Sequence, residues 1–288
     1  MSSDWFAHYK LYRDIKLSVN YKTLSPLRIG ASKGKSLFSP IDLQVLRINI
    51  NGKELPYIPG SSLKGVFRSA SESITKSYNI ETCLSGSCSE VIKNGVTRNE
   101  CLQDAIRNND VNRVINILNE YCLCCKLFGS NTYASHIKFV DAYPNEDKVR
   151  LGVKTGIAIN RRSGGVQKGP FDVEFVSPNS EFNGEIILTN TPNYAIGLLA
   201  KVIDNINAGF IRLGGFKSRG FGKVKLTITS IEGIINTDDG FKRIDEVNTL
   251  HALDDNDMNI RFDPKNPLTI LEEAKKVFEE YAKSSSNQ

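Results

Sequence analysis

The stretch LPYIPGSSLKGVFRSASESI, residues 55–74, passes from a strand-like run into a helical pattern through a sharp corner. Pro59-Gly60 is a turn signal. Ser61 or Ser62 is suited to cap the helix that follows, because a serine hydroxyl accepts an otherwise unpaired backbone N–H. The sequence therefore predicts a strand, a tight turn and a capped helix in succession.

Two bases lie on this predicted helix. Lys64 and Arg68 are four residues apart, so they share one helical face near the positive end of the helix dipole. Such a face suits an anion, most simply a phosphate. The alternative is an ordinary capped helix with a solvated basic face, which these residues alone leave open.

The segments around this stretch predict an α+β protein with an antiparallel sheet. Residues 12–21 alternate between apolar and polar side chains, which is typical of a half-buried strand. Residues 42–50 and 55–58 flank Asn51-Gly52 and predict a hairpin. A strand over 184–190, a helix over 193–206 and an alternating run from Val224 follow. This mixed order favours α+β over a doubly wound sheet.

Composition narrows the class of protein. The chain has 288 residues, 40% of them hydrophobic, and carries a net charge of +5. This mildly basic balance is compatible with a nucleic-acid partner but does not require one. No segment has the apolar core of a signal peptide or a membrane span, so we expect a cytoplasmic protein without structural disulfides. With three histidines, histidine-dependent catalysis has few candidates.

All six cysteines fall in a region that resembles an insertion, about residues 75–130. Cys83 and Cys88 flank LSGS, and Cys122 and Cys125 form a C-x-x-C. Two such pairs separated by a loop and a helix predict a four-thiolate zinc site. The remaining two, Cys101 and Cys124, are the less favoured ligands. The alternative is a set of buried free thiols.

Two glycine-rich basic segments predict contacts with a nucleic-acid backbone. Residues 212–223, RLGGFKSRGFGK, place Lys217 and Arg219 among glycines and two phenylalanines, and they do not match a Walker loop. A second segment, about residues 153–180, predicts a hairpin that reaches over an extended RNA or DNA strand, and its bases are Lys154, Arg161, Arg162 and Lys168. The alternatives are a flexible basic turn and a mobile hairpin tip.

Two further predictions concern a carboxylate and the C-terminus. Asp42 lies beside this basic surface, where a carboxylate binds metal, pairs with a base or does chemistry, although a lone loop aspartate is by default solvated. We expect a core over residues 1–235 and an extension over 236–288. The extension ends in an amphipathic helix whose apolar face is suited to docking, with Ile270, Leu271, Ala274, Phe278 and Tyr281 on that face.

Together, LPYIPGSSLKGVFRSA, CKLFGS, KTGIAINR…GPFDVEFV and GGFKSRGFGKV resemble the RAMP (repeat-associated mysterious protein) superfamily over about residues 12–230. The resemblance is greatest to the repeated backbone subunit of type III CRISPR effector complexes. It implies a modified RNA-recognition-motif (ferredoxin-like) sheet with a zinc-binding insertion and a thumb hairpin. It also implies guide-phosphate contacts from Ser61, Ser62, Lys64 and Arg68, and support of the RNA path by Lys217 and Arg219.

The same resemblance implies an activity and partners. Asp42, in IDLQV, matches the family's target-cleaving aspartate, with Mg²⁺ or Mn²⁺ as the cleavage metal. The partners would be CRISPR RNA, target RNA and other effector subunits, including similar backbone subunits. Gln44 in place of the usual proline, His136 where a base is expected and the long tail depart from the family pattern. The alternatives are a non-catalytic architectural subunit and a guide-processing endoribonuclease with a histidine base.

Overall fold

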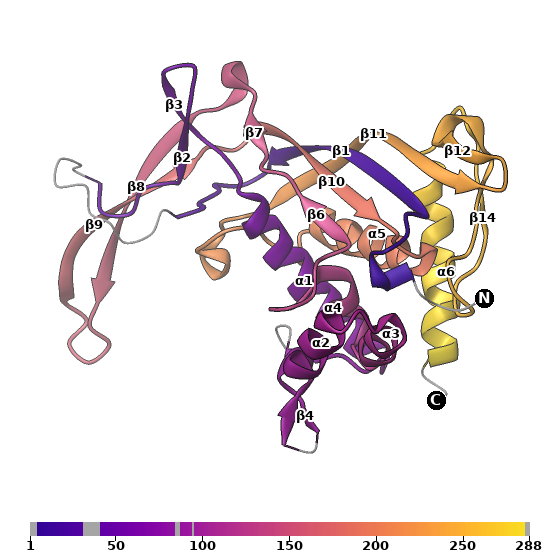
Figure 1. The fold of residues 1–288 in the computed structure, drawn as a ribbon. Helices are drawn as coiled ribbons and strands as arrows, with labels where there is room; N and C mark the ends of the chain where they lie inside the picture. Colours follow the sequence, from indigo (N-terminus) through magenta and orange to yellow (C-terminus); the bar gives the residue numbers. More distant parts are fainter. Residues whose placement is uncertain (1–4, 31–40, 84–86, 94, 286–288) are drawn as a thin grey trace.

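The centre of the molecule is β1 (Arg13–Thr23), whose alternating sequence divides it between two environments. The computed structural model describes residues 5–30, 41–83, 87–93 and 95–285 (Figure 1). Ile15, Leu17 and Val19 are each 2% exposed, whereas the intervening side chains are half-buried. The predicted half-buried strand is confirmed, and its apolar side forms the floor of the core.

Five further strands complete an antiparallel sheet around β1. They are β6 (Ile137–Phe139), β7 (Tyr143–Pro144), β10 (Glu181–Thr189), β11 (Val224–Thr237) and β12 (Gly240–Arg243). The strand order is β12-β11-β1-β10-β6, with β7 paired to β10. The chain visits β1, α1, β6, β10, α5 and β11 in that order. This succession with this strand order is the ferredoxin-like arrangement, so the predicted fold class is confirmed.

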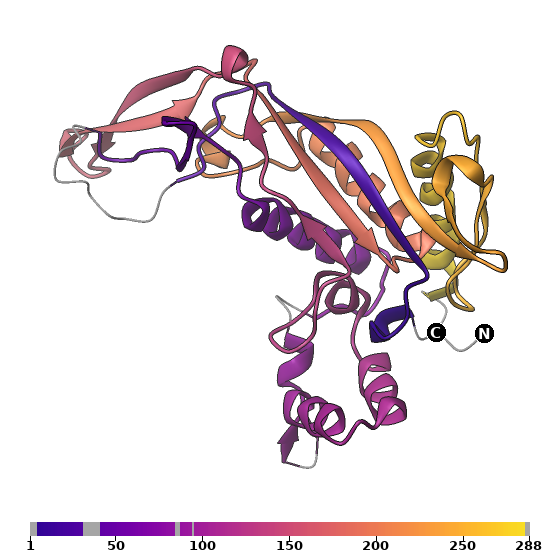
Figure 2. The same cartoon turned by 45° about the horizontal axis from the view of Figure 1, so that its top comes forward.

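Helices α1 (Gly60–Ser77) and α5 (Asn193–Asn207) cover one face of the sheet (Figures 1 and 2). Helix α1 begins at Gly60, where a Cβ atom would lie 2.1 Å from the carbonyl oxygen of Phe139. Only glycine permits this approach to β6. The predicted serine cap is wrong: the N-cap is Pro59 without a side-chain bond, and the Gly60 N–H donates to Asp141 Oδ1 at 2.7 Å.

The cysteine-rich insertion extends below the sheet from the end of α1 (Figure 2). It contains a 3₁₀ turn (Ser87–Glu90), β4 (Ile92–Lys93), β5 (Val96–Thr97), α2 (Arg98–Arg107), α3 (Val111–Asn119) and α4 (Leu123–Phe128). Local signals form its helices: Thr97 and Glu100 make a capping box for α2, and Asp110 caps α3.

A long hairpin, β8 (Leu151–Ile159) and β9 (Val166–Val176), projects from another side of the sheet (Figure 1). The predicted short hairpin is also present, as β2 (Arg47–Ile50) and β3 (Lys53–Pro56) around Asn51-Gly52. Leu43 bridges to Val173 of β9. The segment before β2 therefore adds to the free edge of β9.

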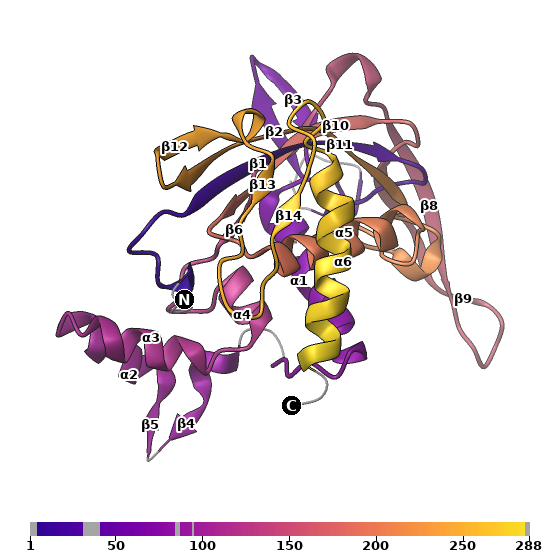
Figure 3. The ribbon, with the colours of Figure 1, turned by 90° about the vertical axis from the view of Figure 1, so that its right-hand side faces the viewer.

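The C-terminal residues pack on α5. A 3₁₀ turn (Ile244–Glu246), β13 (Thr249–Leu250) and β14 (Ile260–Arg261) lead to α6 (Thr269–Ser285), which lies against α5 (Figure 3). The rings of Tyr194 and Tyr281 stack with centroids 4.1 Å apart. Among the described residues, no helix combines the length and apolar character needed to cross a membrane.

Candidate nucleic-acid interface and metal centre

The four cysteines singled out in the sequence converge in space. Their Sγ atoms all lie within 4.8 Å of one another. The Sγ of Cys83 is 3.2 Å from that of Cys125 and 3.6 Å from that of Cys122. A tetrahedral zinc ion with Zn–S bonds of about 2.3 Å places sulfurs about 3.8 Å apart. The four cysteines can hold a metal ion, and both the donor set and the spacing are compatible with zinc.

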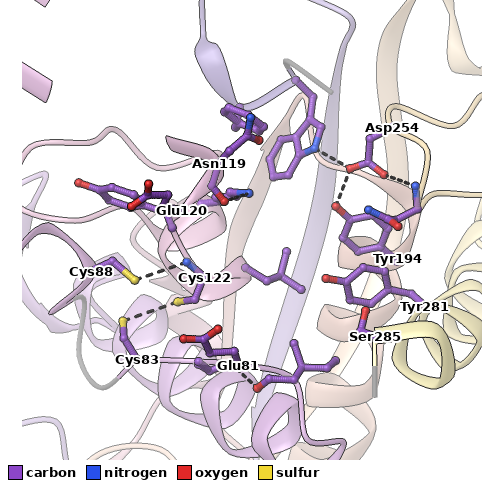
Figure 4. A pocket seen from close by; sticks show the side chains of 18 of the residues that line it. Glu81, Cys83, Cys88, Asn119, Glu120, Cys122, Tyr194, Asp254, Tyr281 and Ser285 are labelled. Atoms are coloured by element: carbon purple, nitrogen blue, oxygen red, sulfur yellow. Dashed lines mark hydrogen bonds between the residues drawn. The ribbon is translucent and has the colours of Figure 1, made fainter. Parts of the chain in front are cut away.

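Two segments of the chain supply these four cysteines. Cys83 follows α1 and Cys88 lies in the 3₁₀ turn, whereas Cys122 caps α4 and Cys125 lies on it. Figure 4 shows Cys83, Cys88 and Cys122 gathered at one side of a cavity. A hydrogen bond with Cys122 raises the pKa of Cys88 to about 12, so without a cation the cluster resists ionising fully.

The other two cysteines lie outside this group. Cys124 is completely buried, with its Sγ 3.8 Å from Thr75 Oγ1. Burial raises the pKa of the Cys124 thiol to about 12, which makes it a poor ligand or nucleophile. Cys101 lies on α2 and is not among the four converging residues.

The predicted phosphate contacts of α1 divide into two kinds. Ser61 is exposed, and Ser62 and Lys64 are half-buried, at the beginning of the helix. Burial and the neighbouring Arg68 lower the pKa of Lys64. Arg68 is turned inward: its Nε donates to Glu72 Oε1 at 2.9 Å and its Nη2 to Cys125 Sγ at 3.4 Å. It therefore does not share the accessible face of the other three.

Three of the predicted bases of the β8–β9 hairpin are exposed. Lys154 is exposed on β8, and Arg161 and Arg162 are exposed in the tip between the strands. Asn160 shapes that tip, since its Oδ1 accepts from the Arg162 N–H at 2.8 Å. Lys168 lies on β9. The hairpin places two guanidinium groups at its far end.

The glycine-rich loop folds back on the segment that follows β1. Gly214 has a φ of 73°, and a Cβ there would lie 2.2 Å from the Arg28 carbonyl oxygen. That oxygen also accepts from the Gly215 N–H at 2.8 Å. Lys217 and Arg219 are exposed in the 3₁₀ turn that follows. The glycines thus bring the loop's bases beside Arg28.

Arg28 is the residue that sequence reasoning missed. Its guanidinium lies 5.6 Å from the ring centroid of Phe216, and that of Arg219 lies 5.2 Å from the same centroid. Phe216 has a left-handed backbone with φ of 56°. Among the residues that the structure describes, the buried Nε of Arg28 has no hydrogen-bond partner. Arg28 in PLRIG precedes a Gly- and Lys-rich stretch, but nothing local to it predicts a contact almost 190 residues away.

The hairpin and the loop share one surface. A cavity of about 100 Å³ lies between them, lined on the hairpin side by Lys154 and Phe171 and on the loop side by Phe216, Arg219 and Phe221. Cations set among aromatic rings are the usual means of holding single-stranded nucleic acid.

Asp42 lies beside the middle of the hairpin, next to Asp172 of β9. Its carboxylate is exposed, and Oδ2 accepts from the Asp172 N–H of β9 at 3.1 Å. Asp172 Oδ1 in turn accepts from Thr155 Oγ1 at 2.6 Å. Behind them, buried Glu174 forms an ion pair with Arg47 and accepts from the Val45 N–H at 3.0 Å. The backbone that carries Asp42 is therefore attached to β9 at several points.

A larger cavity, about 980 Å³, separates the insertion from the C-terminal residues (Figure 4). The cysteine ligands lie on one side, and Tyr194, Asp254 and Tyr281 lie on the other. Asp254 Oδ2 accepts from Trp5 Nε1 and from the Tyr194 hydroxyl, both at 2.8 Å. No sequence pattern had indicated this cavity, because its walls come from distant parts of the chain.

Comparison with known proteins identifies the family. No curated protein matches the chain. The family model described as "RAMP superfamily" matches residues 20–225. This match begins within β1 and ends within β11, and it includes α1, the four converging cysteines, the basic hairpin, β10 and α5. With most of its length covered by that model, the chain belongs to the RAMP superfamily.

Proposed function

We propose that this protein is an RNA-binding backbone subunit of a type III CRISPR effector complex that holds CRISPR RNA and cuts target RNA through Asp42. RAMP membership indicates a CRISPR-associated RNA-binding protein. The observation that carries the finer proposal is the meeting of three elements at one end of the sheet. They are the basic hairpin, the glycine-rich loop and the segment that holds Asp42.

The RNA path in this proposal follows bases at the start of α1, in and beside the glycine-rich loop, and on the hairpin. Ser61, Ser62 and Lys64 contact guide phosphates at the start of α1, and Lys217, Arg219 and Arg28 support the same backbone from the loop. The hairpin, with Lys154, Lys168 and the tip arginines, reaches across the paired strands. Phosphate contacts of this kind fix position without reading sequence, which suits a subunit that accepts any guide.

Cleavage would use the ribose 2′-hydroxyl of the target. A nucleotide pushed out of its stack can align that hydroxyl with the adjacent phosphate, which a stacked A-form strand does not allow. Attack forms the 2′-O–P bond of a 2′,3′-cyclic phosphate and breaks the bond from phosphorus to the 5′-oxygen. The 2′-hydroxyl gives up one proton, and the departing 5′-oxygen takes up one to become a 5′-hydroxyl. Asp42 would orient the hydroxyl or hold Mg²⁺ or Mn²⁺, which supplies charge stabilisation when bound.

One observation favours the architectural alternative. In the part of the chain that the structure describes, the only group of three or more histidine, cysteine or acidic side chains poised to hold a metal is the cysteine quartet. A metal at Asp42 would need RNA phosphate oxygens to complete its coordination. The guide-processing alternative has less support, because His136 is completely buried against Tyr133, and His8 precedes β1 with its ring stacked on that of His136.

The test assembles the complex with guide RNA and compares wild type with Asp42→Asn. We expect target fragments at regular spacing from wild type with Mg²⁺, and none from D42N or in EDTA, with target affinity unchanged. Cleavage that persists in D42N would contradict the catalytic assignment. Absent cleavage in both proteins with tight binding retained would identify the architectural subunit.

RNA binding is measured in the same preparation. Arg161→Ala/Arg162→Ala should weaken RNA binding and reduce the salt slope by about one per lost phosphate contact. The matched control is Lys276→Ala/Lys283→Ala, two exposed lysines on α6 far from the hairpin (Figure 1). Equal losses of RNA affinity in the two double variants would show that binding depends on net charge and not on a defined RNA path along the hairpin.

A further inference from the structure

Arg68 lies midway along α1 and directs its guanidinium into the protein. Nη2 donates to Cys125 Sγ at 3.4 Å, and Nη1 donates to the Gly129 carbonyl oxygen at 2.9 Å. The side chain is only 17% exposed. Because Cys125 lies on α4 and Gly129 is its C-cap, one guanidinium holds that helix at two points.

The contacts also fix the orientation of the guanidinium. Glu72, one turn further along α1, accepts from Nε at 2.9 Å and is 10% exposed at its side chain. Three nitrogens of Arg68 are thus directed to three different acceptors. A planar group held in this way cannot turn toward RNA without giving up bonds in a largely buried place.

Charge explains why a cation belongs at this sulfur. Four thiolates around one divalent ion leave two negative charges in excess, and burying that excess costs free energy unless donors lie beside the sulfurs. The Cys122 N–H donates to Cys88 Sγ at 3.4 Å. Arg68, one of the predicted RNA contacts, adds a charged donor at Cys125.

We propose that Arg68 is a positioning residue of the metal centre and not a contact of the RNA. It orients Cys125 and offsets thiolate charge. It thereby links metal binding to α1, the helix that carries Ser61, Ser62 and Lys64 near its start. The inference goes beyond the proposed function, because it rests on the cysteine cluster and not on RNA binding.

The experiment measures zinc affinity by competition with a chromophoric chelator, using the full-length protein. Arg68→Met should bind zinc about 10- to 100-fold more weakly, the usual effect of removing a partner of a metal ligand. Lys64→Met, one turn earlier on the same helix, is the matched control and should leave zinc affinity unchanged while weakening RNA binding. Unchanged zinc affinity in R68M, or no zinc binding by wild type, overturns the proposal.

A conservative variant keeps the test decisive if R68M fails to fold. Arg68→Lys retains the charge but cannot reach three acceptors at once. With cobalt in place of zinc, its thiolate charge-transfer and visible bands should shift from those of wild type, with an affinity between wild type and R68M. A wild-type spectrum and affinity in R68K overturn the proposal. A failure here leaves the RNA assays of K64M and wild type interpretable on their own.

Discussion

Among single residues, His136 is a buried histidine whose pKa is shifted by its environment. It is 0% exposed, its Nδ1 lies 2.8 Å from the Thr189 carbonyl oxygen and its ring stacks on His8 at 3.9 Å. Burial, and secondarily the charge of His8, lowers the pKa of His136 from 6.5 to about 4. A group with a pKa lowered by folding is held neutral by the folded state and takes up a proton more readily when unfolded.

The sign of the pH dependence follows from this shift. The stability that neutral His136 provides is present above pH 6.5 and is lost as the pH falls toward about 4. The loss amounts to up to about 3 kcal/mol of unfolding free energy. Urea unfolding at pH 7.5 and pH 4.5 should show a smaller pH difference for His136→Gln than for wild type. The exposed His251→Gln is the control, and equal pH differences in both variants would contradict the assignment.

Residues that lie together in the structure were predictable from the sequence where the determinant is local. The zinc-type cysteine spacing selected the four residues that converge. Arg68 was expected on an RNA-facing surface because helical spacing pairs it with Lys64, yet its acceptors at Cys125 and Gly129 come from a segment about 60 residues later. The capping of α1 likewise depends on Asp141. Long-range partners of this kind leave no periodic signal in the chain.

At the scale of elements, the same distinction holds. The hairpin turn at Asn51-Gly52 formed as predicted, since it depends on a few neighbouring residues. Pairing of the Asp42 segment with β9 was not predicted, because a bridge between Leu43 and Val173 requires the sheet to be assembled first. The presence of a strand, turn or helix was therefore easier to predict from the sequence than the element with which it pairs.

The cysteine-rich insertion should depend on bound metal for its order. Helix α2 packs on α3 and on the 3₁₀ turn that carries Cys88, and α3 also meets the N-terminal 3₁₀ turn (Trp5–Ala7). Small elements of this kind need a metal to offset their limited core. Chelation should increase amide exchange in 98–119 while β1 stays protected. Cys122→Ser should behave like the chelated protein, and Cys101→Ser should behave like wild type. Unchanged protection of α2 and α3 after verified metal removal would contradict this expectation.

At the scale of the whole molecule, most functional candidates lie in connections between elements of the ferredoxin-like sheet, and Ser61, Ser62 and Lys64 lie on α1. The cysteine site follows α1, the hairpin joins β7 to β10, and the glycine-rich loop joins α5 to β11. The sheet fixes the ends of each connection, so the hairpin, the loop and the Asp42 segment meet although the sequence separates them widely. The residues after β12 do not contribute to these candidates. They pack on α5 and contact the N-terminal residues.

Asp257 joins this C-terminal part to the body by hydrogen bonds to α5, and substitution of Asp257 tests how much that connection stabilises the fold. Its carboxylate accepts from the Asn193 and Tyr194 N–H groups at 3.0 and 3.2 Å and so caps α5. It also faces the buried Arg13, whose pKa burial lowers to about 10. Asp257→Ala should lower the unfolding free energy by about 2–4 kcal/mol, since a buried cap is lost and a buried cation loses its counter-charge.

The measurement is chemical denaturation of D257A beside Asp263→Ala. Asp263 is exposed and accepts only from a local turn N–H, that of Lys265, so its loss should cost less than about 1 kcal/mol. If the two variants lose the same stability, the C-terminal residues are an appendage that the fold does not need. A large loss confined to D257A would mean that β13, β14 and α6 fold together with the RAMP-type sheet. The family match ends before those elements, so the stable unit would then be larger than the matched region.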